Sequence, residues 1–110
     1  MTDPTLVPQI DVGHLAERRE QGAFVLDVRE PDEYQAGHVP GAVLIPLGEV
    51  VQRHREVPAD EDVYVICLTG ARSARAVEFL NASGHRTTNV AGGTKNWIAA
   101  GFAVNRGDRP

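Results

Sequence analysis

The sequence predicts an α/β fold, in which a parallel sheet is covered by helices on both faces. Four short runs of strand-like composition, residues 24–26, 42–45, 63–66 and 87–90, alternate with segments that carry a helical pattern. The third run, Val-Tyr-Val-Ile, has no charged or strongly polar position, as expected for a strand buried on both faces. Strands and helices that alternate at this spacing favour a parallel sheet, because each return crossing is made by a helix.

Length and composition indicate one globular domain. The chain has 110 residues, of which 42% are hydrophobic and 24% charged, and this is enough to bury a core. A net charge of −4, with scattered arginines and a single lysine, leaves no basic face for nucleic acid. No apolar run approaches the length of a membrane span. We therefore expect neither a nucleic-acid nor a membrane partner.

The cysteine count and the start of the chain predict a soluble, cytoplasmic protein. Cys67 is the only cysteine, so no internal disulfide can form and the fold suits a reducing compartment. Residues 1–9 lack the charged start and apolar stretch of a secretory signal. The four histidines share no metal-ligand spacing with one another or with Cys67, so we expect no metal site.

Five helices are expected between the strands, over residues 13–21, 32–36, 47–53, 73–80 and 95–100. Asp11 is a suitable N-cap for the first, and Pro31 suits the first turn of the second. The fourth carries an apolar stripe for the core and ends before Gly84, a residue suited to the C′ position. Gly92 and Gly93 turn the chain into the last helix.

The two ends of the chain are expected to lie outside the domain. Residues 1–9 contain two prolines and no periodicity, which predicts a loose lead-in. Residues 105–110 are a polar tail. The domain is thus expected to span residues 10–104.

Cys67 ends the third strand and opens a short loop that runs into the fourth helix. Such a loop points several backbone N–H groups at one spot, with the helix dipole behind them. A thiol placed there has a lowered pKa, and Arg72 adds a positive charge with a donor fork suited to an oxyanion. A lone cysteine at the end of an apolar strand is more often a small core residue. Gly70 and Arg72 favour a nucleophile in an anion-binding cradle, because a core cysteine needs neither.

Three segments carry a common resemblance. Residues 67–73, Cys-Leu-Thr-Gly-Ala-Arg-Ser, are similar to the Cys-x-x-Gly-x-Arg-Ser active-site loop of the single-domain rhodaneses, which are sulfurtransferases. Residues 27–34, Asp-Val-Arg-Glu-Pro-Asp-Glu-Tyr, followed by Gly-His-Val-Pro-Gly-Ala at 37–42, resemble the N-terminal signature of that family. Residues 92–97, Gly-Gly-Thr-Lys-Asn-Trp, resemble its C-terminal signature. The resemblance covers essentially the whole chain.

The resemblance implies a rhodanese-like three-layer fold with a mostly parallel sheet of about five strands. It implies that Cys67 takes sulfane sulfur from thiosulfate or a persulfide and passes it, as a persulfide, to cyanide or a thiol. No cofactor is required. The substrate-binding loop would consist of Leu68, Thr69, Gly70, Ala71, Arg72 and Ser73. Arg72 would hold the oxyanion of the donor or support the loop from behind.

Two further polar residues are expected to support the site rather than react. Asp27 ends a strand on the same side as Cys67 and could hold the loop or Arg29 in place. A structural role is favoured for Asp27, because a carboxylate close to the thiolate would raise the pKa of the thiol. His38 lies in a turn, where a histidine that bonds the backbone is expected, and Trp97 is expected in the core.

Two alternatives remain open at this stage. The first is a cysteine phosphatase or arsenate reductase of related fold, whose active-site loop has the pattern Cys-x5-Arg. The spacing from Cys67 to Arg72 is the shorter Cys-x4-Arg, which favours sulfur transfer. The second alternative is a regulatory or sulfur-relay module with little turnover of its own. Many active relatives have a basic residue directly after the cysteine, and Leu68 stands there in this chain. The sulfur donor, the acceptor and the oligomeric state cannot be read from these motifs.

Overall fold

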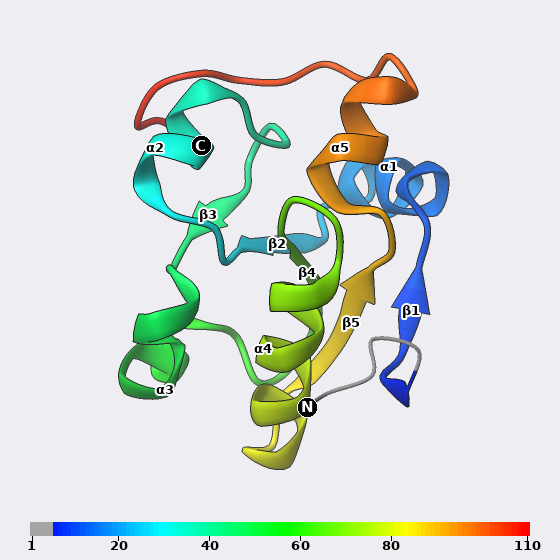
Figure 1. Ribbon diagram of the computed structural model, residues 1–110. Helices are drawn as coiled ribbons and strands as arrows, with labels where there is room; N and C mark the ends of the chain where they lie inside the picture. Colours follow the sequence, from blue (N-terminus) through cyan, green and yellow to red (C-terminus); the bar gives the residue numbers. More distant parts are fainter. Residues whose placement is uncertain (1–5) are drawn as a thin grey trace.

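Figure 1 shows a computed structural model of the protein, which describes residues 6–110. Five strands form a single sheet of order β1-β5-β4-β2-β3, and every neighbouring pair is parallel. The strands are β1 (Gln9–Ile10), β2 (Phe24–Asp27), β3 (Val43–Leu44), β4 (Asp62–Ile66) and β5 (Arg86–Val90). The expected fold class is confirmed. The strand order, which the sequence left open, puts β4 in the centre of the sheet, and Cys67 directly follows it.

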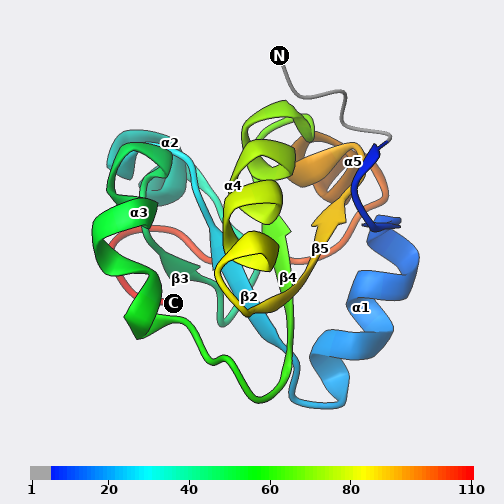
Figure 2. The same ribbon diagram turned by 90° about the horizontal axis from the view of Figure 1, so that it is seen from below.

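The helices occur where the sequence predicts them. They are α1 (Val12–Glu20), α2 (Pro31–Ala36), α3 (Val50–Arg53), α4 (Ala71–Ala82) and α5 (Gly93–Ala99). Short 3-10 turns, η2 (Leu47–Glu49) and η3 (His54–Glu56), flank α3. Figures 1 and 2 show that α3 and α4 cover one face of the sheet, while α1, α2 and α5 cover the other. In the described part of the chain, none of these helices combines the length and the apolar composition needed to cross a bilayer.

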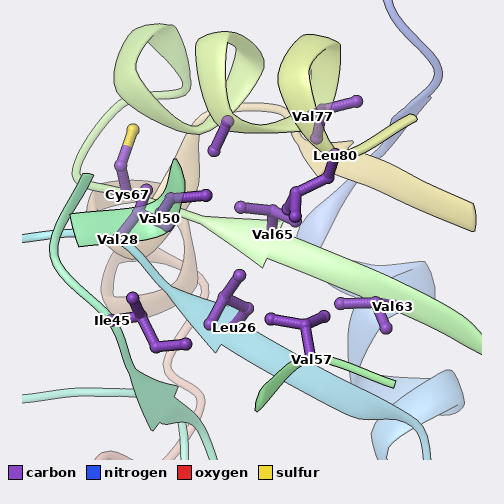
Figure 3. Close-up of a cluster of buried hydrophobic side chains, with 11 residues drawn as sticks. Leu26, Val28, Ile45, Val50, Val57, Val63, Val65, Cys67, Val77 and Leu80 are labelled. Atoms are coloured by element: carbon purple, nitrogen blue, oxygen red, sulfur yellow. The ribbon is translucent and has the colours of Figure 1, made fainter. Parts of the chain in front are cut away.

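Each face of the sheet carries its own hydrophobic cluster, and β4 contributes to both. Val63 and Val65 pack with residues of α3 and α4, as Figure 3 shows, whereas Tyr64 and Ile66 face α1, α2 and α5. All four side chains are buried. The alternation explains why this run has no strongly polar position, because a parallel strand covered on both faces has no side open to water.

Both ends of the described chain are more firmly attached than the sequence predicts. Residues 1–5 of the expected lead-in lie outside the described residues, and Gln9 belongs to β1, which pairs with β5. Gln9 thus lies in the sheet rather than in the expected lead-in, and no pattern in the sequence indicated this, because a strand of two residues is too short to show a period. In the tail, Asn105 forms an isolated antiparallel β-bridge with His38. The Gly107 N–H donates to the carbonyl of Gln35 (2.8 Å).

All four expected strands differ from their expected bounds. β2 extends one residue further, to Asp27, and β3 covers two of the four residues expected. β4 and β5 each begin one residue early. The helix expected to begin at Ser73 begins at Ala71, so the loop after Cys67 is shorter than the pattern suggested. A shorter loop directs the first free N–H groups of α4 closer to the end of β4.

Candidate active site

Cys67 lies where the central strand of the sheet meets the N-terminus of its longest helix. The chain leaves β4 at Ile66, turns through three residues and enters α4 after Gly70, the N-cap residue. Gly70 has φ +118°, a left-handed conformation that L side chains rarely adopt. This glycine therefore allows the tight turn that brings the helix N-terminus back over the sulfur.

The sulfur of Cys67 is buried but contacts polar donors. The residue is 1% exposed and its neighbours in the core include Val28 and Val50. Figure 3 shows the sulfur pointing toward α4 and away from the remainder of that cluster. The Gly70 N–H donates to Sγ at 3.1 Å, and the Ser73 hydroxyl lies 3.2 Å from Sγ. A cysteine that served only to fill the core would not need donors aimed at its sulfur.

These donors change the acidity of the thiol. Burial is the largest single effect and raises the pKa of Cys67, because it disfavours the charged thiolate. The Ser73 hydroxyl and the backbone N–H groups of Ser73, Gly70 and Thr69 act in the opposite direction. Together they outweigh burial and hold the pKa of Cys67 below its ordinary value. The site therefore favours the thiolate, which is the nucleophilic form.

The first turn of α5 supports the loop from the opposite side. The Thr94 N–H and hydroxyl donate to the carbonyl of Cys67 (2.9 and 3.1 Å), and the Lys95 N–H donates to the carbonyl of Leu68 (3.0 Å). A Cβ at Gly93 would lie 2.5 Å from both carbonyl oxygens. Only glycine permits this approach. Hydrogen bonds from α5 thus fix both carbonyls on the side away from α4. This orientation of the peptide units leaves the N–H groups of the loop on the side of the sulfur.

Arg72 is engaged with another residue. Its guanidinium donates to both carboxylate oxygens of Glu33 in α2, at 2.7 and 2.8 Å. The hydrogen bonds from Arg72 lower the pKa of Glu33 to about 2. Of the two roles expected for Arg72, support of the loop fits this geometry, because the donor fork is already occupied by a carboxylate.

Asp27 and Arg29 form a closed, buried ion pair at the end of the neighbouring strand. Asp27 is 0% exposed and Arg29 3%. Arg29 Nε and Nη2 contact the carboxylate at 2.9–3.2 Å, and Nη2 also donates to the carbonyl of Gly37 (2.8 Å). Both charges are satisfied within the pair, which fits the supporting role expected for these two residues.

The exposed part of the loop is neutral. Leu68 is 42% exposed, and Thr69 and Ala71 are exposed as well. Of the remaining loop residues, Gly70 and Ser73 are buried and Arg72 is half-buried in its ion pair. The exposed surface of the loop therefore carries an apolar side chain, Leu68, and no charge.

Three residues whose side chains contact the loop were not predicted as site residues. Glu33 holds Arg72, Thr94 holds the carbonyl of Cys67, and Asn89 in β5 contacts both Gly70 and Ser73. The sequence could have indicated Asn89, because a polar asparagine is unusual at a strand position that is expected to be covered by a helix. The expected backbone bonds of His38 are present, since its ring nitrogens contact the carbonyls of Tyr34 and Arg109, both at 2.7 Å.

Comparison with known proteins decides the family. Residues 11–100 match the family model described as Rhodanese-like domain. The chain belongs to this family. Among curated rhodanese relatives, it is 32% identical to a sulfurtransferase of Allochromatium vinosum, with 90% of this chain and 95% of that protein covered. It is 35% identical to the putative sulfur carrier protein YrkF of Bacillus subtilis, with 83% of this chain covered. The chain spans about half, 51%, of the length of YrkF.

A solved structure supports the same assignment. The rhodanese-related protein of Thermoplasma volcanium has a TM-score of 0.83 and 37% sequence identity to this chain. The match covers 88% of this chain and 96% of that one.

Within residues 6–110, no group of three or more histidine, cysteine, aspartate or glutamate side chains is arranged to hold a metal ion.

Proposed function

We propose that this rhodanese-like domain is a sulfurtransferase that carries sulfane sulfur on Cys67. The observation that carries the proposal is the pair of donors, the Gly70 N–H and the Ser73 hydroxyl, at 3.1 and 3.2 Å from a buried sulfur. Such donors stabilise an anionic sulfur without neutralising it. They therefore suit a group that alternates between thiolate and persulfide.

The reaction would proceed in two balanced steps. The Cys67 thiolate attacks the outer sulfur of the donor and forms an S–S bond, while the S–S bond of the donor breaks. Sulfite leaves if the donor is thiosulfate, and a thiolate leaves if the donor is a persulfide. An acceptor, cyanide or a thiolate, then attacks the terminal sulfur and regenerates the Cys67 thiolate. No external oxidant or reductant is needed, because the sulfur atom is transferred without its bonding electrons.

The donor class we favour is a persulfide rather than thiosulfate. Thiosulfate carries two negative charges, and Arg72 is already paired with Glu33. Leu68 exposes an apolar surface at the loop, which suits the organic body of a persulfide. The donor is a small molecule or a protein-borne persulfide, and the same apolar surface favours a thiol as the acceptor.

A second candidate is a sulfur-relay module with little turnover of its own. The neutral loop surface around Leu68 favours it, and so does the similarity to a protein named as a putative sulfur carrier. A relay would form the same Cys67 persulfide and release it only to a specific partner. The cysteine phosphatase alternative has no such support, because the cradle in this chain is the shorter Cys-x4-Arg type.

Intact-protein mass spectrometry tests the proposal. After incubation with thiosulfate or with a small-molecule persulfide, we expect a mass gain of about 32 Da, one sulfur atom, that dithiothreitol removes. Cys67→Ser should show no gain and no thiocyanate production, with its fold intact by circular dichroism. Thiocyanate production by that variant would refute the assignment. A persulfide that forms but is not passed to cyanide or to a small thiol would favour the relay.

A further inference from the structure

Asn89 connects the two groups that contact the sulfur. It is 1% exposed and lies in β5 on the face that packs against α4. Its Nδ2 donates to the carbonyl of Gly70 (3.1 Å) and to Oε1 of Gln9 (3.0 Å), and its Oδ1 accepts from the Ser73 hydroxyl (2.5 Å). The carbonyl of Gly70 can only accept a hydrogen bond, so the amide nitrogen must face Gly70 and the oxygen must face Ser73.

Ser73 cannot satisfy both of its neighbours at once. Its hydroxyl has one proton and lies 2.5 Å from Asn89 Oδ1 and 3.2 Å from Cys67 Sγ. When Cys67 is a neutral thiol, the short bond to Oδ1 holds the proton, and the thiol can donate to the hydroxyl oxygen. When Sγ is negative, a hydrogen bond to the charged sulfur is roughly twice as strong as a neutral one. The Ser73 hydroxyl then rotates, and its hydrogen bond to Asn89 Oδ1 is replaced by one to the sulfur.

We propose that Asn89 is a positioning residue that acts on Cys67 through Ser73 and Gly70. It keeps the Gly70 N–H directed at the sulfur and competes with the sulfur for the Ser73 proton. The inference rests on the proposed function, in which the charge of Sγ changes in each half-reaction. As the thiolate becomes the inner, neutral sulfur of the persulfide, the Ser73 proton returns to Asn89. When the acceptor removes the outer sulfur, the proton turns back to the thiolate.

Nuclear magnetic resonance on the unaltered protein tests the hydroxyl switch. The side-chain amide signals of Asn89 should shift with pH at the same midpoint as the alkylation rate of Cys67 by iodoacetamide. The shift should be absent in Cys67→Ser, which forms no thiolate in this range. Asn81 is a matched internal control, because its carboxamide also joins α4 to β5, through Thr87, at the opposite end of the helix. Asn89 signals that do not follow the titration would overturn the proposal.

A variant gives an independent measurement. Asn89→Asp replaces the donor to Gly70 with an oxygen and binds the Ser73 proton more tightly, so both changes disfavour the thiolate. We expect the alkylation midpoint to rise by about one pH unit, which is tenfold less thiolate below the midpoint. Asn81→Asp should leave the midpoint unchanged. If Asn89→Asp does not fold, the resonance measurement alone decides.

A double variant separates positioning from charge alone. Ser73→Ala should itself raise the alkylation midpoint, because the thiolate loses a donor. In that background Asn89→Asp should raise it further by less than half of its effect in the unaltered protein. Equal shifts in both backgrounds would mean that the carboxylate acts only through space, and would overturn the role of Ser73. Alkylation and resonance shifts do not require sulfur transfer, so these results are distinguishable from a failure of the proposed function.

Discussion

Two neighbouring strands, β2 and β4, end side by side and yet lead into different chemical environments. Asp27 pairs with Ile66 in the sheet register, so the residues that follow the two strands emerge at the same edge. After β2, the carboxylate of Asp27 meets the guanidinium of Arg29, and each charge neutralises the other. After β4, the Cys67 sulfur meets N–H and O–H donors instead.

The difference shows how one sheet edge supports both a closed ion pair and a sulfur surrounded by hydrogen-bond donors. A buried carboxylate beside a buried guanidinium is a closed unit, because separating the charges leaves one of them uncompensated in the protein interior. Backbone dipoles around a sulfur are not consumed in this way. They stabilise whichever sulfur anion is present, so the group they surround can change during a reaction. Four variants would break or sharpen this contrast.

The largest effect is expected from breaking the closed pair. Asp27→Asn leaves the Arg29 guanidinium buried without a counter-charge, and should lower the free energy of unfolding by about 3–5 kcal/mol. Denaturant unfolding followed by circular dichroism measures this change. The double variant Asp27→Asn/Arg29→Met should recover part of the loss, because no buried charge remains. Cys67→Ser should cost less than about 1 kcal/mol, since it removes no charge pair. If Asp27→Asn were as stable as the unaltered protein, the pair would not be the closed unit described.

A smaller but more specific effect is expected where α5 touches the loop. A methyl group at Gly93 would lie 2.5 Å from the carbonyls of Cys67 and Leu68, so Gly93→Ala must push the loop away from α5. We expect persulfide formation to slow by about a hundredfold, because a displaced loop no longer aims its N–H groups at the sulfur. Stopped-flow measurement with a persulfide donor would show this.

Gly101→Ala is the matched control for that variant. Gly101 also has a positive φ, +84°, and a Cβ there would have no neighbour within 4 Å. Gly101→Ala therefore imposes backbone strain without moving the loop after Cys67. Equal losses of activity in the two variants would show that strain, and not contact with the loop, is responsible.

A still smaller effect is expected from adding a charge to the exposed surface of the loop. Leu68→Arg should raise kcat/KM for thiosulfate by about tenfold, the effect of one contact of about 1.4 kcal/mol, and added salt should reduce the gain. Leu68→Gln controls for the loss of apolar surface, and should not improve the use of thiosulfate. A Leu68→Arg variant with no gain at low ionic strength would mean that position 68 does not face the donor.

The smallest effect concerns the ion pair that engages Arg72. The pKa of Glu33 is about 2 in the folded protein and about 4.3 in an unfolded chain, so the pair stabilises the fold above pH 4.3. Its contribution is lost as the pH falls from there toward 2. The difference in free energy of unfolding between the unaltered protein and Glu33→Gln should therefore be constant near pH 6 and shrink on acidification. High salt should reduce it, because the pair is partly exposed. A difference that persists unchanged at pH 2 would contradict the ion pair.

The sequence by itself determined the layered fold, the succession of elements from α1 onward and the position of Cys67 at the end of a strand. These depend on local signals: apolar runs, the cap at Asp11, the glycine at 84 after α4, and a cysteine at the end of a buried strand. Each signal acts between residues close in the chain, so its outcome does not depend on how the sheet is ordered. The Asp27–Arg29 pair belongs to the same group, because its members are two residues apart.

Only the tertiary structure decided what surrounds the loop after Cys67. Arg72 reaches Glu33 across 39 positions of sequence, and Asn89 reaches Gly70 across 19. Both contacts require β4 to lie between β2 and β5, an order that no local pattern encodes. The same order brings Gly93 beneath Cys67. The sequence thus left two roles open for Arg72, since a guanidinium in a loop is free for an anion only when folding brings no carboxylate to it.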